Sequence, residues 1–319
     1  MNIVILDYEG INPGDLSFEK LEKLGNLTLY KSCPKDDEVI IERCKDADMI
    51  VVVYTKINEK VMEALPKLKY IGLSSTGFNH IDLEAARKNN ITVTNVPGYG
   101  SDAVAQHALA LLLEVTNRTG FYNRDVKKGR WSKVGSWHFE DYPVIELKDK
   151  TIGILGLGKI GLQAAKIYKA MGMKVLAYNR SQNDQAKKYL DYVGLETIFE
   201  KSDIIDLHLP LNDGTENIIN KKSIEKMKDG VIIINTARGG LIDESALIEA
   251  IENGKIYGVG LDVVRKEPIA DDNPLLKYDN IIITPHMAWG ARETRQRLMD
   301  IASDNIKAFI DGKEKNKVN

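Results

Sequence analysis

Short runs of β-branched and other apolar residues alternate with helix-length amphipathic stretches along nearly the whole chain. These runs are the expected strands: Ile3–Asp7, Met49–Tyr54, Tyr70–Ser74, Thr92–Asn95, Thr151–Leu155, Lys174–Tyr178, Ile204–Leu209, Val231–Asn235, Tyr257–Asp262 and Asn280–Thr284. Strands separated by helix-length segments form βαβ units, whose strands are parallel and whose helices cover both faces of a sheet. The sequence therefore predicts an α/β protein with doubly wound parallel sheets.

One interval separates the early strands from the later ones. Ser101–Val115 (SDAVAQHALALLLEV) predicts a long, almost wholly apolar helix, and an irregular stretch with Trp131 and Trp137 follows it as far as Pro143. At 319 residues the chain is also long for one hydrophobic core. We expect two domains joined by this helix, with a last helix over Arg292–Ile310 packed back on the first. One large continuous sheet is the alternative.

The composition excludes several classes of protein. A formal charge of −2 gives no reason to expect nucleic acid or an anionic membrane as a partner. No stretch approaches about 18 uninterrupted apolar residues, and the opening NIVILD is a strand pattern, so neither a membrane span nor a secretion signal is expected. Cys33 and Cys44 have no metal-type neighbours and imply no disulfide framework. We expect a cytoplasmic protein without a metal site.

The motif GLGKIG, at residues 156–161, has the GxGxxG spacing of a dinucleotide-binding loop. It follows a predicted strand and opens a helix, and a second strand arrives before residue 180. In such a loop the first glycine permits a tight turn, the second lets the backbone approach a pyrophosphate, and the third lets helix approach strand. The expected cofactor contacts here are Gly156, Gly158, Lys159 and Ile160. A plain strand–turn–helix, with glycines for packing, is the alternative.

The strand after this helix ends in Asn179, Arg180 and Ser181. A site selective for NAD usually places Asp or Glu here, where the carboxylate accepts a hydrogen bond from the ribose 2′-hydroxyl. An arginine without a competing carboxylate can instead pair with a 2′-phosphate. Asn179 and Arg180 therefore favour NADP(H) over NAD(H), although an exposed arginine at a strand end is common and use of both cofactors stays open.

A nicotinamide enzyme that oxidises an alcohol needs a proton acceptor and a group that holds the substrate. Of the five histidines, His286 and His208 lie at the ends of predicted strands, and ligands of open α/β sheets bind at the carboxyl ends of the strands. His107 lies inside the apolar helix and is expected to pack there, whereas His80 and His138 lie in polar, loop-like segments. The acid/base candidates are therefore His286 and His208.

Two charged residues at other strand ends favour His286. Arg238 follows Val231–Asn235 and precedes two glycines, and Glu267 falls just after Tyr257–Asp262. An arginine holds a carboxylate through two parallel hydrogen bonds, and a carboxylate beside an imidazole fixes its tautomer and raises its pKa. We predict that Arg238, Glu267 and His286 converge on one crevice. Each of them alone is equally compatible with a surface charge or a helix cap.

The ordered motifs GLGKIG, INTARGGLIDE, LDVVRKEP and TPHMAW resemble the D-isomer-specific 2-hydroxyacid dehydrogenase family, and the similarity covers essentially the whole chain. The resemblance implies that Arg238 binds the substrate carboxylate and carbonyl, that His286 is the general acid/base and that Glu267 is its hydrogen-bonded partner. It places Asp262 near the nicotinamide amide. Further residues are implied to line the cofactor, together with Arg238 and His286: Leu209, Pro210, Thr215, Thr236 and Ala237.

The same resemblance implies a Rossmann dinucleotide-binding domain, residues 100–287, inserted into a flavodoxin-like substrate-binding domain, residues 1–99 plus 288–319. The active site would lie in the interdomain cleft, which would close on the substrate. The segment with the tryptophans resembles the family's dimer-forming region, so a homodimer is expected. Packing of those tryptophans into the core is the alternative.

The loop Leu73–Asp82 resembles the family's substrate-carboxylate loop, because backbone N–H groups around Ser75, Thr76 and Gly77 can form a nest for an anion. Phosphoglycerate dehydrogenases usually carry basic residues in this loop. The loop here has serines instead, so a phosphorylated substrate is not expected.

Gln106 and Trp289 carry most of a further likeness to bacterial glycerate dehydrogenases, which are hydroxypyruvate reductases. The expected reaction is NAD(P)H-dependent reduction of hydroxypyruvate or glyoxylate to the D-2-hydroxy acid, D-glycerate or glycolate. A dehydrogenase for lactate- or isocaproate-type acids and a dinucleotide-sensing corepressor are the alternatives. Formate dehydrogenases are also similar in fold, but their usual histidine partner is a glutamine, whereas this chain has Glu267.

Overall fold

The computed structural model describes residues 1–32 and 34–319. Cys33, for which the sequence predicts neither a metal site nor a disulfide framework, lies outside the described residues. The chain divides into two compact units: unit 1 is Met1–Gly100 with Trp289–Asn319, and unit 2 is Ser101–Ala288. Cys44 is free and buried in unit 1, and burial raises the pKa of its thiol to about 12. No helix of the described residues is long and apolar enough to cross a membrane.

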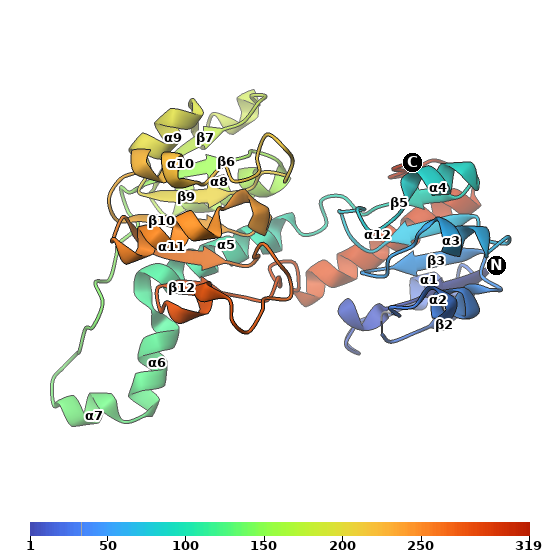
Figure 1. The fold of residues 1–319 in the computed structure, drawn as a ribbon, viewed down its shortest axis with the longest axis horizontal. Coiled ribbons are helices and arrows are strands. Elements are labelled where there is room, and N and C mark those ends of the chain that lie inside the picture. Colours follow the sequence, from blue (N-terminus) through green and yellow to red (C-terminus); the bar gives the residue numbers. More distant parts are fainter. Residues whose placement is uncertain (33) are drawn as a thin grey trace. The chain divides into compact units, whose positions relative to one another are not determined.

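Unit 1 is built on a parallel sheet of five strands among the described residues, in the order β2-β1-β3-β4-β5 (Figure 1). The strands are β1 (Asn2–Ile5), β2 (Asn26–Leu29), β3 (Met49–Val52), β4 (Tyr70–Leu73) and β5 (Thr92–Thr94). The helices are η1 (Tyr8–Gly10), α1 (Glu19–Glu22), α2 (Asp37–Cys44), α3 (Glu59–Glu63), α4 (Leu83–Lys88) and α12 (Arg292–Ile310). This is the strand order of flavodoxin-like folds.

Helices cover both faces of the sheet of unit 1. Residues of α2, α3 and α4 pack with Val4 and Ile50 of the sheet in one core cluster, whereas α12 packs against Ile3 and Ile5 in the other. The alternation of Ile3, Val4 and Ile5 between the two clusters follows from the period of two along a strand. The last helix, α12, therefore packs on the sheet of unit 1.

Unit 2 contains a parallel sheet of seven strands, again counted over the described residues, in the order β12-β11-β10-β9-β6-β7-β8. The strands are β6 (Thr151–Leu155), β7 (Lys174–Tyr178), β8 (Asp191–Tyr192), β9 (Ile204–Leu207), β10 (Val231–Asn235), β11 (Ile256–Leu261) and β12 (Ile281–Ile283). The order reverses between β6 and β9, as in the Rossmann fold, where ligands bind at this switch point. Two separate sheets show that the alternative of one large sheet is wrong.

The helices of unit 2 are α5 (Ser101–Asn117), α6 (Thr119–Lys127), α7 (Arg130–Val134), α8 (Lys159–Ala170), η2 (Asp184–Ala186), α9 (Leu195–Lys201), α10 (Lys221–Lys226), η3 (Gly239–Leu241), α11 (Glu244–Glu252) and η4 (Pro274–Lys277). The apolar helix α5 packs with α8 against Ile232 and Ile234 of β10. On the other face α9, α10 and α11 pack against Ile233. Both faces of β10 are thus buried, as its continuous apolar run predicts.

The sequence predicted an irregular stretch between α5 and β6, but the helices α6 and α7 form within it. These helices extend away from the sheet of unit 2 (Figure 1). The guanidinium of Arg130 donates hydrogen bonds to Asp125 and Asp141. It also lies over the ring of Phe139, 4.4 Å from the ring centroid. Trp131 and Trp137 are 50% and 95% exposed, so the alternative that they belong to the core is wrong.

Candidate active site

The glycine loop of unit 2 has a specific use for each glycine. Gly156 follows β6 with φ of +96°, and a Cβ there would lie 2.6 Å from the carbonyl oxygen of His208. A Cβ on Gly161 would lie 2.2 Å from the carbonyl oxygen of Gly156, whereas that of Gly158 would meet nothing within 4 Å. The first and third glycines therefore allow close packing, and the second leaves open backbone at the start of α8. That open backbone fits a dinucleotide pyrophosphate.

The end of β7 is hydrogen-bonded to this loop through Asn179. Its Oδ1 accepts from the N–H of Leu157 at 3.1 Å, and its Nδ2 donates to the carbonyl oxygen of Ser181 at 2.7 Å. The amide thus holds the glycine loop in place, which the sequence did not reveal. The next side chain, Arg180, is exposed.

The loop after β9 and the end of β10 hold the other residues expected to line the cofactor. Thr215 donates to the carbonyl oxygen of Pro210 at 2.6 Å and so closes the loop that contains Leu209. At the end of β10, the N–H of Ala237 donates to the side chain of Asn235. The hydroxyl of Thr236 is buried without a hydrogen-bond partner in the described part of the chain, so it is a polar group that a bound cofactor can satisfy.

His286 and Glu267 meet at the carboxyl ends of β12 and β11. The distance from His286 Nδ1 to Glu267 Oε2 is 2.6 Å, and Glu267 Oε1 accepts from the N–H of Val264 at 3.2 Å. The side chains are 44% and 36% exposed, so this pair is open to solvent. The predicted pairing of the two residues is therefore present in the geometry.

Arg238 lies in the turn after β10, and its exposed side chain donates to the carbonyl oxygen of Ala237 at 2.7 Å. A Cβ on the next residue, Gly239, would lie 2.0 Å from the carbonyl carbon of Val264. Only a glycine allows the two backbones to approach this closely. The turn that carries Arg238 is thereby packed against the loop that carries Glu267.

His208, the other strand-end candidate, faces the interior. Its side chain is 2% exposed, and its Nε2 lies 2.9 Å from Asp206 Oδ2, which also accepts from the hydroxyl of Tyr168 at 2.7 Å. Burial, together with the neighbouring carboxylate of Asp206, holds the pKa of Tyr168 well above its ordinary value. His208 therefore belongs to a buried polar cluster, whereas His286 is exposed.

Asp262, at the end of β11, is almost fully buried and its carboxylate faces other parts of unit 2. It accepts from the hydroxyl of Thr284 at 2.6 Å and from the N–H groups of Met287 at 2.9 Å and Ala288 at 2.8 Å. Burial alone would raise the pKa of Asp262, but the bonds from His107, Thr284 and these N–H groups outweigh it and hold the pKa below its usual value. His107, which was expected to pack inside the apolar helix, also has a polar partner, because its Nε2 lies 2.9 Å from Thr284 Oγ1.

The loop Ser75–Gly77 belongs to unit 1 and is fixed by its own hydroxyls. Ser75 Oγ donates to the carbonyl oxygen of Gly77 at 2.6 Å, and Thr76 Oγ1 donates to that of Val96 at 2.9 Å. Asn95 donates to the carbonyl oxygen of Thr76 at 2.8 Å. The loop is therefore held by hydrogen bonds to the segment after β5.

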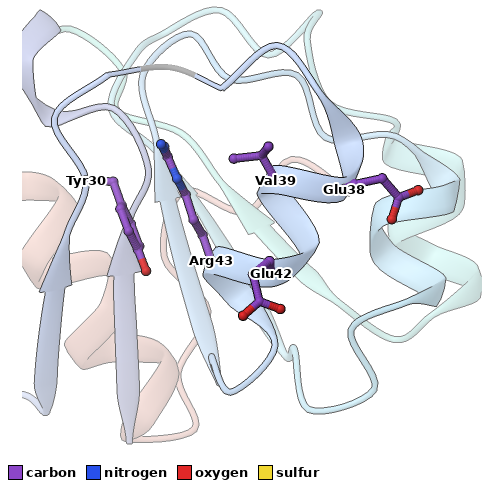
Figure 2. Close-up of a pocket in the computed structure, with 5 residues that line it drawn as sticks. All are labelled: Tyr30, Glu38, Val39, Glu42 and Arg43. Atoms are coloured by element: carbon purple, nitrogen blue, oxygen red, sulfur yellow. The ribbon is translucent and has the colours of Figure 1, made fainter.

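A hollow elsewhere on unit 1 contains none of the predicted site residues. Figure 2 shows that it is lined by residues around α2: Tyr30, Glu38, Val39, Glu42 and Arg43. The guanidinium of Arg43 lies over the ring of Tyr30, 4.6 Å from its centroid. The chemistry-bearing residues gather instead at the strand ends of unit 2. No cluster of His, Cys, Asp and Glu suited to a metal ion occurs among the residues with described positions.

A parallel sheet of this order with a glycine turn at its switch point binds dinucleotides. Hydride transfer next to such a cofactor needs residues that exchange a proton and hold an anion, and histidine, glutamate and arginine are suited to these tasks. The fold and the residues at its strand ends therefore define the class of dinucleotide-dependent oxidoreductases.

Comparison with known proteins narrows the class. Residues 109–288 match the family model described as "D-isomer specific 2-hydroxyacid dehydrogenase, NAD binding domain". The chain belongs to the D-isomer specific 2-hydroxyacid dehydrogenase family, and it is an oxidoreductase that acts on a CH–OH group.

Three curated relatives have related activities. A hydroxypyruvate reductase of Blautia hydrogenotrophica is 45% identical over 321 residues, covering 100% of both chains. A glycerate dehydrogenase of Methylorubrum extorquens is 39% identical, covering 88% of each chain. A glyoxylate reductase of Korarchaeum cryptofilum is 38% identical and covers 92% of this chain and 89% of its own. All three names describe conversions of small 2-oxo or 2-hydroxy acids.

Solved structures confirm the fold over the full length and show both cofactor types. An acyclic imino acid reductase in complex with NADPH and D-Arg has a TM-score of 0.85 and 32% identity, with 100% of both chains covered. A D-lactate dehydrogenase with NAD⁺ from Lactobacillus jensenii has a TM-score of 0.85 and 31% identity, covering 100% of this chain and 99% of its own.

Proposed function

We propose that this protein reduces hydroxypyruvate or glyoxylate to the D-2-hydroxy acid, D-glycerate or glycolate, with NAD(P)H as the reductant. The observation that carries the proposal is the 2.6 Å contact between His286 and Glu267, beside the turn of Arg238. The relative that is 45% identical over both full chains is a hydroxypyruvate reductase, which supports this substrate class.

In the proposed mechanism Arg238 binds the substrate carboxylate with its guanidinium, whose planar fork matches two carboxylate oxygens. The nicotinamide cofactor, when bound, would supply the hydride that reduces the carbonyl carbon. His286 donates a proton from Nε2 to the carbonyl oxygen, and Glu267 stabilises the imidazolium through Nδ1 before that transfer. The oxo acid, NAD(P)H and one proton thus give the hydroxy acid and NAD(P)⁺. Oxidation reverses these steps, with His286 as the base.

The proposed cofactor is NADP(H) in preference to NAD(H). Its pyrophosphate would bind at Gly156, Gly158, Lys159 and Ile160. The exposed Arg180 would pair with the 2′-phosphate, because Asn179 places no competing carboxylate there. The remaining proposed contacts are those that the family resemblance implies, at Leu209, Pro210, Thr215, Thr236, Ala237 and Asp262.

The two units are proposed to bind different partners of the reaction. Unit 2 would bind the dinucleotide, and unit 1 would contribute to substrate binding through backbone N–H groups at Ser75, Thr76 and Gly77. The exposed Trp131 of α7 and the exposed Trp137, which follows α7, support a homodimer, because aromatic side chains are enriched at protein interfaces.

The test is consumption of NADH and of NADPH, measured separately, with hydroxypyruvate, glyoxylate, pyruvate and 2-oxoisocaproate. We expect hydroxypyruvate or glyoxylate to have the highest kcat/KM. A preference for pyruvate or 2-oxoisocaproate would support the proposed type of reaction but would show that the proposed substrate is wrong. No turnover with any of the four acids, from folded protein that binds dinucleotide, would contradict the proposal and favour a sensing role.

A further inference from the structure

A chain of hydrogen bonds joins helix α5 to the turn that carries His286. His107 Nε2 lies 2.9 Å from Thr284 Oγ1, and that hydroxyl lies 2.6 Å from Asp262 Oδ1. A hydroxyl has one proton. Because Thr284 donates it to the Asp262 carboxylate, Thr284 must accept from His107. The Nε2 of His107 therefore carries a proton both in the neutral ring and in the charged ring.

Asp262 in turn holds the backbone from His286 to Ala288. It accepts from the N–H groups of Met287 and Ala288, and the N–H of His286 donates to the carbonyl oxygen of Asp262 at 2.9 Å. His286 has φ of +51°. A non-glycine residue persists in this left-handed region only where its surroundings fix it, and here Asp262 supplies those contacts.

We propose that His107 and Thr284 are positioning residues, which orient the Asp262 carboxylate so that it fixes the turn carrying His286. This inference rests on the proposed acid/base role of His286. The carboxylate of Asp262 is 0% exposed, so it has no water to replace a lost donor. Loss of the Thr284 hydroxyl removes a donor from the carboxylate itself. Loss of His107 removes the group that orients this hydroxyl and whose Nε2 also lies 3.4 Å from Asp262 Oδ1. In both cases we expect the turn to loosen.

The test compares variants that remove a donor with variants that keep it. His107→Leu removes the donor, whereas His107→Gln keeps an N–H near the position of Nε2. Thr284→Val removes the hydroxyl, whereas Thr284→Ser keeps it. Thr116→Val is the matched control, because Thr116 is a buried threonine of α5 that donates to the carbonyl oxygen of Leu112 within its own helix.

With saturating NADPH and oxo acid, we expect kcat to fall roughly 10- to 100-fold in His107→Leu and in Thr284→Val, as small misplacements of a reacting group do. His107→Gln, Thr284→Ser and Thr116→Val should stay within about threefold of the parent. In His107→Leu and Thr284→Val the Kd for NADPH should change less than kcat does, and in the other three variants it should stay within about threefold of the parent. Equal losses in cofactor binding and kcat, or no loss of kcat in either donor-removing variant, would overturn the proposal.

Amide hydrogen exchange at Met287 and Ala288 tests the positioning without relying on turnover. Both amides should exchange faster in His107→Leu and Thr284→Val than in the parent, and at the parental rate in Thr116→Val. Unchanged exchange in both donor-removing variants would overturn the proposal. If His286→Ala kept full activity, the proposed function would fail, but this exchange measurement would still decide whether His107 and Thr284 fix the turn.

Discussion

Nδ1 of His286 lies 2.6 Å from Oε2 of Glu267, although the two residues are 19 positions apart in the chain. A carboxylate only accepts hydrogen bonds, so the Nδ1 of His286 must be the protonated nitrogen in this pair. The contact therefore leaves Nε2 as the nitrogen for exchange with a substrate, and it selects a tautomer that the sequence leaves undetermined.

Replacement of His286 should remove the proton transfer. We expect His286→Ala to lower kcat by roughly 10²- to 10⁴-fold, the usual contribution of a general acid/base, and to change the Kd for NADPH by much less. Steady-state kinetics and cofactor titration measure both quantities. Glu267→Gln should lower kcat by about 10- to 100-fold, because a charge-assisted hydrogen bond to the imidazolium is lost. Turnover of His286→Ala within threefold of the parent would remove His286 from this role.

The Arg238→Lys variant keeps the positive charge but lacks the planar fork. We expect the KM for the oxo acid to rise by about tenfold or more, with a smaller effect on the KM for the cofactor, because a single ammonium cannot bind both carboxylate oxygens in parallel. The two Michaelis constants of the same variant serve as mutual controls. An unchanged KM for the oxo acid would show that Arg238 does not hold the carboxylate.

Cofactor preference should depend on Asn179 and Arg180. Arg180→Ala should weaken NADPH binding and leave NADH binding nearly unchanged, since only NADPH has the 2′-phosphate. Asn179→Asp should shift the preference towards NADH. The new carboxylate can still accept from Leu157 N–H, but it loses the bond to Ser181, so the urea midpoint serves as a stability control. Variants with the parental ratio of kcat/KM for NADPH and NADH would refute this assignment.

The buried cluster beside the glycine loop should contribute to stability. Tyr168→Phe removes a donor to Asp206, whose Oδ1 already lacks a hydrogen-bond partner among the described residues. We expect the free energy of unfolding to fall by about 1–3 kcal/mol, the cost of an under-satisfied buried group, in urea denaturation. Tyr278→Phe is the control, because its hydroxyl donates to Glu252 at the surface and should matter less. Equal effects of the two substitutions would contradict the prediction.

His80 should make folding stability depend on pH. Burial lowers the pKa of His80 below its ordinary value of 6.5, and its Nε2 is buried without a hydrogen-bond partner in the described structure. The unfolded chain therefore takes up the proton first as the pH falls. The contribution of His80 is fully present above pH 6.5 and is lost as the pH falls through the lowered folded-state value. In His80→Gln the free energy of unfolding, measured by urea denaturation, should depend less on pH between about pH 7 and 5 than in the parent. A pH dependence equal to the parent's would contradict the prediction.

Buried parallel strands could be predicted from the sequence because both of their faces are apolar. The predicted bounds of β6, β7 and β10 are those observed, as are the bounds of α12. The edge strands β2 and β8 were missed. Most side chains of β2 are exposed and β8 has two residues, and such strands are held by backbone hydrogen bonds that leave no apolar pattern.

The sequence by itself determined the family, the two α/β domains, and which charged residues end which strands. The sequence also favoured His286 over His208 as the acid/base. Only the tertiary structure decided what each histidine contacts: the Nε2 of His208 lies beside Asp206, and the Nδ1 of His286 lies beside Glu267. The tertiary structure also showed that His107, inside an apolar helix, is hydrogen-bonded to Thr284, which is 177 positions away in the chain. The physical reason is that these contacts join separate helices and strands, and the order and register of the sheet set which of them meet.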